Sequence, residues 1–139
     1  HLGNVYSKMG RPGKAVTYYG MSLRIKRDIG DRMGEARCLV RIGLEFQSLG
    51  ELDRSFDSFE EARGLFESLE DDNGIAVCCE NLGESYMKAG DIDKAVAAYE
   101  RCLLIKTELW DKVGQAQCLD SLGLACYARG DFAGAAGYY

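Results

Sequence analysis

The sequence has little of several residue types on which common protein chemistries depend. It contains one histidine, His1, at the very end of the chain. A serine or cysteine nucleophile elsewhere therefore has no histidine to act as its base. Its 17 lysines and arginines against 22 aspartates and glutamates give a net charge of −5, which argues against a nucleic-acid footprint. No apolar run reaches about 18 residues, so we expect no membrane-spanning helix and no membrane partner.

The missing motifs point the same way. There is no glycine-rich phosphate loop and no Cys-x-x-Cys pair of the kind that binds zinc. We therefore expect no catalytic residues, no cofactor and no metal. Proline is scarce too, with Pro12 as its one example, so no proline-rich linker divides the chain and we expect one continuous module.

What the sequence does contain is a repeat with a period of 40 residues. A leucine or isoleucine followed by glycine occurs four times, as Leu2-Gly3, Ile42-Gly43, Leu82-Gly83 and Leu122-Gly123. A fixed period of this kind indicates a stack of similar supersecondary units. We expect a single array with a partial repeat over 1–30, complete repeats over 31–70 and 71–110, and a partial repeat over 111–139. Both ends are cut inside a repeat, which predicts a slice of a longer array.

Each repeat predicts two antiparallel helices. In 31–50, apolar residues at spacings of three and four form one helical stripe, and Gly50 follows where a left-handed helix end favours glycine. An aspartate precedes this stripe in successive repeats, at Asp31, Asp71 and Asp111, and is expected to cap the helix. The second helix is expected from about 53 to 69. Its inward residues would be Phe56, Phe59, Ala62, Phe66 and Leu69.

The glycine inside the first helix of each repeat predicts a close approach of the second helix. Glycine in a helix interior costs about 1 kcal/mol relative to alanine, so its recurrence needs a reason. In the second repeat we expect the small Ser55 to face Gly43 and the aromatic Phe59 to fill the wider space beside it. We also expect Trp110 to pack at the joint between two repeats.

The cysteines recur with the repeat as well. Cys38, Cys78 and Cys118 occupy the same place in successive units, while Cys79, Cys102 and Cys126 are scattered. This pattern predicts free, buried core thiols in a reducing compartment, which favours a cytoplasmic location.

These features together resemble a known repeat family. A period of 40 also suits HEAT and armadillo repeats. The order of a small residue and then an aromatic residue on the second helix, however, argues against both of these families. Leu82-Gly83-Glu84-Ser85-Tyr86, followed by Ala95, Tyr99 and Cys102, resembles the tetratricopeptide repeat (TPR). Units of this length resemble the Pins-type repeats of G-protein-signalling modulators, and those of rapsyn and Tonsoku. The resemblance implies an all-α, right-handed solenoid of helix A and helix B pairs that serves as a protein-binding scaffold.

In such arrays the A helices line a concave groove that takes a partner peptide, so the groove residues are those on helix A that avoid the packing stripe. They are Asn4, Arg37, Val40, Arg41, Leu44, Gln47, Glu80, Asn81, Glu84, Met87, Gln117, Asp120, Ser121, Leu124 and Tyr127. The same face also holds Ser7, Lys8, Ser48, Val77 and Lys88. A basic peptide would be drawn to the end that carries Glu80, Glu84 and Asp120, and an acidic one to the end with Arg37 and Arg41.

The sequence also bears on three functions other than groove binding. The clamp that holds chaperone C-terminal carboxylates is disfavoured, because Asn4 or Asn81 alone agrees with it in either register. A structural segment that associates end to end through its cut repeats, with Tyr138 and Tyr139 at one end, is the first alternative. A regulatory arm of a larger multidomain protein is the second.

Overall fold

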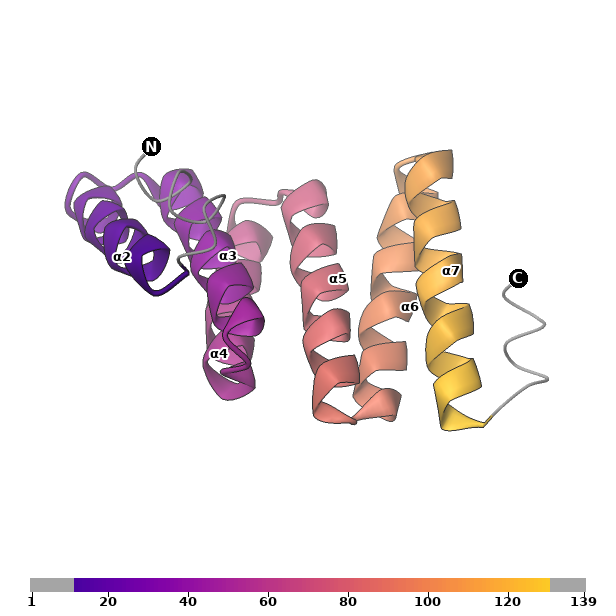
Figure 1. The fold of residues 1–139 in the computed structure, drawn as a ribbon. Coiled ribbons are helices and arrows are strands. Elements are labelled where there is room, and N and C mark those ends of the chain that lie inside the picture. The colour runs from indigo at the N-terminus through magenta and orange to yellow at the C-terminus, as the bar shows by residue number, and fades with distance from the viewer. Residues whose placement is uncertain (1–11, 131–139) are drawn as a thin grey trace. The chain divides into compact units, whose positions relative to one another are not determined.

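The computed structural model describes residues 12–130, which form six α-helices joined by short turns (Figure 1). The helices are α2 (Pro12–Asp28), α3 (Arg32–Ser48), α4 (Leu52–Ser68), α5 (Asp72–Ala89), α6 (Ile92–Glu108) and α7 (Lys112–Arg129). These described residues contain no strand, so the all-α prediction is confirmed. Predictions that concern Asn4, Ser7, Lys8, Tyr138 or Tyr139 lie outside the described residues.

The turns between these helices share one hydrogen-bond pattern. At the end of α2, the Asp31 amide donates to the Lys26 carbonyl, and the Gly30 amide donates to the Arg27 carbonyl. This is the glycine-type helix end in which a left-handed residue satisfies the last free carbonyls. Gly30, Gly50, Gly90 and Gly130 all have positive φ there, as the sequence predicted for Gly50.

Two of the turns place a larger residue in this left-handed position. Glu70 and Trp110 have φ of 54° and 57°. The position directs its side chain away from the helices, and Trp110 is 83% exposed. The prediction that Trp110 packs at the joint is therefore wrong, because the turn geometry orients the indole toward solvent.

Aspartate side chains cap α3 and α7 directly after such turns. Asp31 accepts from the Gly34 amide at 2.8 Å, and Asp111 accepts from the Gly114 amide at 2.9 Å. A lysine completes each cap, since the Lys106 ammonium lies 3.3 Å from the Asp111 carboxylate and Lys26 lies at the same distance from Asp31. The N-cap prediction is confirmed at Asp31 and Asp111.

The caps predict a pH-dependent contribution to stability. The Gly114 amide, and after it Lys106, lowers the pKa of Asp111 below its ordinary value of 3.8. A carboxyl whose pKa is lowered by folding stabilises the fold above its unfolded pKa and loses this effect as the pH falls through its folded pKa. We expect Asp111→Ala to lower the midpoint of thermal unfolding by a few degrees at pH 7 and by less at pH 3.

Asp111→Asn is the matched control for that change, because asparagine also accepts the amide hydrogen bond and caps helices well. Thermal melts followed by circular dichroism at both pH values measure the difference. An alanine variant with the same deficit at pH 3 as at pH 7 would contradict the role of the charged carboxylate.

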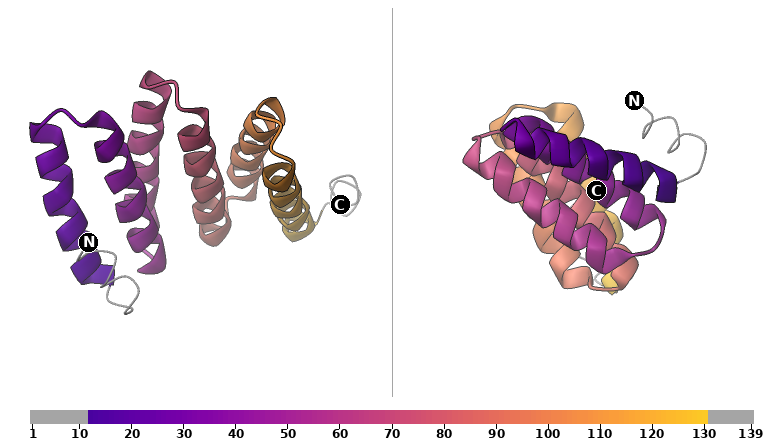
Figure 2. Two further views of the ribbon diagram at one scale, coloured as in Figure 1. Left: turned by 90° about the horizontal axis from the view of Figure 1, so that it is seen from above. Right: turned by 90° about the vertical axis from the view of Figure 1, so that its left-hand side faces the viewer.

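The described helices fall into two compact units that divide between Asp71 and Asp72. In the first unit α3 packs against both α2 and α4, and in the second α6 packs against both α5 and α7. Figures 1 and 2 show the three helices of each unit side by side. The A helices α3, α5 and α7 begin at Arg32, Asp72 and Lys112, and each B helix follows its A helix directly.

On α3 and α5, the glycine inside helix A makes room for an aromatic ring on the following helix B. A methyl group built on Gly43 would lie 2.6 Å from the Phe59 ring, and one on Gly83 would lie 2.5 Å from the Tyr99 ring. Both distances are far below van der Waals contact, so close approach is confirmed as the reason for these glycines. The predicted partner is corrected: the nearest atoms belong to the aromatic ring and not to the small residue, because the ring itself lies against the bare helix backbone.

The cores of both units are apolar and contain all six cysteines as free, buried thiols. Phe59 is fully buried, and Ala62 and Phe66 are buried with it. Phe56 and Leu69, which were also expected to face inward, are half-buried at the margin.

Candidate functional site

A pocket of about 330 Å³ opens on the second unit, where side chains of α5, α6 and α7 converge. It is lined by Glu84, Met87, Lys88, Tyr99, Ser121 and Leu124. Glu84, Met87 and Lys88 come from α5, Ser121 and Leu124 come from α7, and Tyr99 reaches it from α6. Helical spacing explains the set, because residues three and four apart lie on one face of a helix.

The floor of the pocket depends on the missing side chain at Gly83. Tyr99 is only 4% exposed, and its ring lies against the backbone of α5 at that glycine. Leu124, in contrast, is 61% exposed and stands at the rim. The pocket therefore has an aromatic base and an aliphatic rim that solvent reaches in the free chain.

The electrostatic character of the pocket is set by Glu84. Loss of hydration, with a further contribution from the negative charge of Glu80, raises the pKa of the Glu84 carboxyl, and Lys88 opposes this shift. Glu80 lies four residues before Glu84 and thus on the same face of α5. Burial, followed by the charges of Glu84 and Glu80, also raises the pKa of the Tyr99 phenol. After loss of hydration, the negative charges of Glu80 and Glu84 contribute to these shifts, so this part of α5 has a negative local potential that Lys88 partly offsets.

The structure brings together four of the predicted groove residues, namely Glu84, Met87, Ser121 and Leu124. Lys88 was placed on the same helix face by its spacing. Tyr99 was missed, because its pattern is that of a core aromatic. The available signal was Gly83, because a glycine on helix A lets the ring of helix B lie against the backbone beside the predicted residues.

The other predicted residues of the second unit lie around the pocket and do not line it. Gln117, Asp120 and Tyr127 are exposed on α7, and Glu80 is half-buried on α5. The Asn81 side-chain amide donates to the Val77 carbonyl of its own helix at 3.0 Å, which occupies one of its donor hydrogens.

In the first unit the predicted residues lie along α3. Arg37 is exposed, Val40 is half-buried and Leu44 is 37% exposed. Arg41 is half-buried, and its guanidinium carbon lies 5.9 Å from the centre of the Tyr19 ring, within the range of a cation–π contact. Gln47 is only 7% exposed, so its prediction as a groove residue is wrong. It follows Gly43 by one turn and shares the packed side of the helix.

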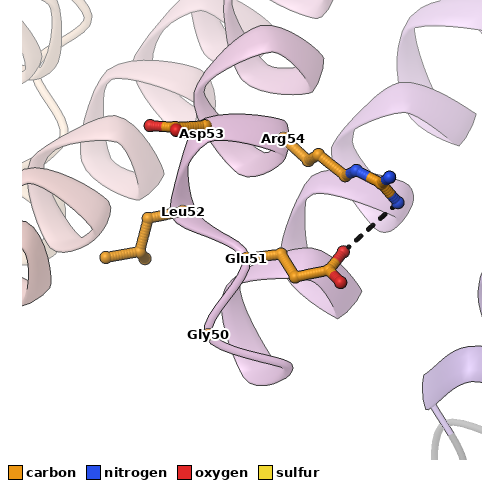
Figure 3. A pocket seen from close by; sticks show the side chains of 5 residues that line it. All are labelled: Gly50, Glu51, Leu52, Asp53 and Arg54. Carbon is orange, nitrogen blue, oxygen red and sulfur yellow. Dashed lines mark hydrogen bonds and ion pairs between the residues drawn. The ribbon is translucent and has the colours of Figure 1, made fainter.

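Larger hollows lie at the turns between the helices of each unit. One of about 430 Å³ is formed by Gly50, Glu51, Leu52, Asp53 and Arg54 between α3 and α4 (Figure 3). Two of its charged side chains form an ion pair with each other, since Arg54 Nη1 lies 3.4 Å from Glu51 Oε2. A similar hollow of about 380 Å³ follows α5, where Arg129 Nη1 lies 3.0 Å from Asp93 Oδ1. Both lie at a glycine turn and lack the aromatic base of the pocket between α5, α6 and α7.

Within residues 12–130, no helix is both long and apolar enough to cross a bilayer. In the same part of the chain, no three His, Cys, Asp or Glu side chains gather as a metal site requires.

Comparison with known proteins gives consistent results. A model of the tetratricopeptide repeat family matches residues 1–68 and 75–139. Human G-protein-signaling modulator 1 is 39% identical over 54 residues, which make up 39% of this chain and 8% of the modulator. The chain thus spans only a small part of that relative.

Solved structures share the fold over nearly the whole chain. BtubC from P. vanneervenii is similar with a TM-score of 0.90 at 27% identity, over 99% of this chain and 57% of BtubC. The Rap conjugation gene regulator of plasmid pLS20, solved in complex with the Phr* peptide, has a TM-score of 0.83 at 17% identity, over 98% of this chain and 38% of the regulator. With its repeated helix pairs, its glycine–aromatic packing and a family match that covers most of its length, this chain belongs to the tetratricopeptide repeat family.

Proposed function

We propose that this chain is a protein-binding module that holds a linear peptide in the groove of its A helices. The observation that carries the proposal is the pocket of the second unit, where the Glu84 carboxylate and the exposed Leu124 side chain lie around a base formed by the buried Tyr99 ring. Such a surface suits an extended or helical segment, whose side chains enter the pocket while polar groups fix its backbone.

The chemistry of the pocket favours a basic side chain in that peptide. Glu84 gains from a nearby positive charge, because both lost hydration and Glu80 disfavour its ionised form in the free chain. The aliphatic stem of a lysine or arginine would lie on Met87 and Leu124 while its charged end reaches Glu84. Lys88 at the rim would repel a second positive charge, which limits the preference to one or a few basic residues.

The family and its relatives support this reading. Peptide binding is seen in the fold, since the Rap regulator of plasmid pLS20 was solved with a peptide. The residues for histidine-assisted nucleophilic catalysis are also scarce in the sequence, which contains one histidine. We therefore infer a binding role and no catalytic one for this segment. Its six free thiols favour a reducing compartment such as the cytoplasm.

Selection from a random library of displayed 12-residue peptides tests the proposal directly. We expect the selected peptides to be enriched in arginine or lysine beside aliphatic residues. Leu124→Asp should weaken their binding about tenfold or more, because loss of roughly half of a buried leucine's contact costs about 1.5 kcal/mol. Fluorescence polarisation with one labelled peptide from the selection gives the dissociation constants.

Leu104→Asp is the matched control, since Leu104 is 58% exposed on α6 and does not line the pocket. A second pair of variants tests the contribution of charge to binding. Glu84→Lys should weaken binding more than Glu100→Lys, and the difference should shrink at high salt. Selected peptides that bind equally well to Leu124→Asp and Glu84→Lys would contradict the proposed groove.

A further inference from the structure

We propose that Cys102 on α6 and Cys118 on α7 are a redox pair that closes to an intramolecular disulfide when the chain meets a small peroxide, and reopens on reduction. Their sulfur atoms lie 2.9 Å apart in the core of the second unit. Cys102 is fully buried and Cys118 is 4% exposed, and both are free thiols. No residue of the peptide pocket is needed for this step, so it stands apart from the proposed function.

The first unit offers a natural comparison for this pair. Eighty residues earlier, Ser22 occupies the place of Cys102 and Cys38 occupies the place of Cys118. The Cys38 thiol donates to the Ser22 hydroxyl at 3.5 Å. The two helices therefore bring the same two positions together in both units, but only the second unit has sulfur at both. Formation of a disulfide there requires a small shortening of the distance and no exchange of neighbours.

The step is a balanced two-electron oxidation. One thiolate sulfur attacks a peroxide oxygen, the O–O bond breaks, and a sulfenic acid forms with release of one water. The second sulfur then attacks the sulfenic sulfur, displaces its hydroxyl group as another water, and completes the S–S bond. With hydrogen peroxide, two thiols and one peroxide give one disulfide and two waters, and the two thiol protons end in those waters.

Burial makes this reaction selective but slow. Loss of hydration raises the pKa of both thiols, so they are protonated at neutral pH and react less readily than an exposed cysteine. A peroxide molecule is small enough to enter when the helices open briefly. Once one sulfur is oxidised, its partner is already in place, which favours the disulfide over higher oxidation.

The disulfide would tie together two of the helices that form the pocket. Tyr99 precedes Cys102 by three residues on α6, and Ser121 follows Cys118 by three residues on α7. Each is thus one turn from the sulfur bridge and on the same side of its helix. A bridge here would hold α7 against α6 and raise the resistance of the second unit to unfolding.

Thiol mapping after oxidation tests the proposal. The 139-residue chain is treated with hydrogen peroxide, quenched with catalase, unfolded and alkylated with iodoacetamide. We expect four alkylated cysteines and one linked peptide pair that contains Cys102 and Cys118, and six alkylated cysteines after treatment with dithiothreitol. The oxidised chain should also unfold at a higher temperature than the reduced chain.

Two variants and one control condition sharpen the result. Cys102→Ala should abolish the link, and Ser22→Cys should add a second link, to Cys38. The chain unfolded in guanidinium before oxidation should give a mixture of links, because all six thiols are then accessible. The exposure to peroxide is extended until cysteines of the folded chain are oxidised; oxidation of other cysteines while Cys102 and Cys118 stay alkylated, or the same mixture of links from the folded chain, would overturn the proposal.

Discussion

Phe59→Ala is expected to lower the free energy of unfolding by about 3–5 kcal/mol, the largest effect of any single substitution considered for this chain. Phe59 is fully buried on α4, and its ring lies against Gly43 of α3. Removal of the ring leaves a cavity at the junction of two helices, and the bare glycine backbone offers no side chain to fill it. Since domains of this size are stable by only about 5–15 kcal/mol, the first unit would be severely destabilised.

Denaturation in urea followed by circular dichroism measures this loss. Met21→Ala is the matched control in the same unit, because Met21 is 58% exposed on α2 and its truncation should change stability by less than about 0.5 kcal/mol. Equal losses for the buried and the exposed residue would show that the ring does not hold the helices together.

Gly83→Ala is expected to destabilise the second unit by about 1–3 kcal/mol even though alanine favours helix formation. The added methyl group would lie 2.5 Å from the Tyr99 ring, and Tyr99 is buried, so the ring or the helix must move. Tyr99 is also the base of the pocket. The same substitution should therefore weaken binding of any peptide that the pocket selects.

Gly64→Ala is expected to have the opposite effect on stability in the same experiment. Gly64 lies exposed within α4, and a methyl group there would meet no atom within 4 Å. We expect it to stabilise the chain by up to about 1 kcal/mol, through helix propensity alone. If both glycine substitutions stabilised the chain, the close contact between α5 and Tyr99 would not contribute to the free energy of unfolding.

The local features of the fold could be predicted because their causes lie within a few residues of one another. Gly50 ends α3 in the left-handed conformation, and Asp111 caps α7 by accepting from an amide three residues ahead. The stripe of apolar residues places Leu39 and Ile42 in the core for the same reason. Each of these depends on helix geometry and not on which other helix is nearby.

The site was predicted less completely, since it depends on how helices meet. Glu84 and Leu124 lie on the expected faces, but Gln47 is buried where its spacing predicted a groove position. Tyr99 is buried like Phe59, its equivalent one repeat earlier, yet its ring also forms the base of the pocket. The spacing of residues along one helix predicts which of them share a face. How far that face is buried depends on the helices that pack against it.

By itself, the sequence determined the helices, their glycine turns, their aspartate caps and the burial of the cysteines, because hydrogen bonds and helical periodicity act between residues close in the chain. The tertiary structure alone decided that an aromatic ring and not the small residue lies against Gly43 and Gly83, that Trp110 faces solvent, and that two sulfurs come within 2.9 Å. These outcomes depend on the packing of separate helices, whose distances are set by all the side chains between them.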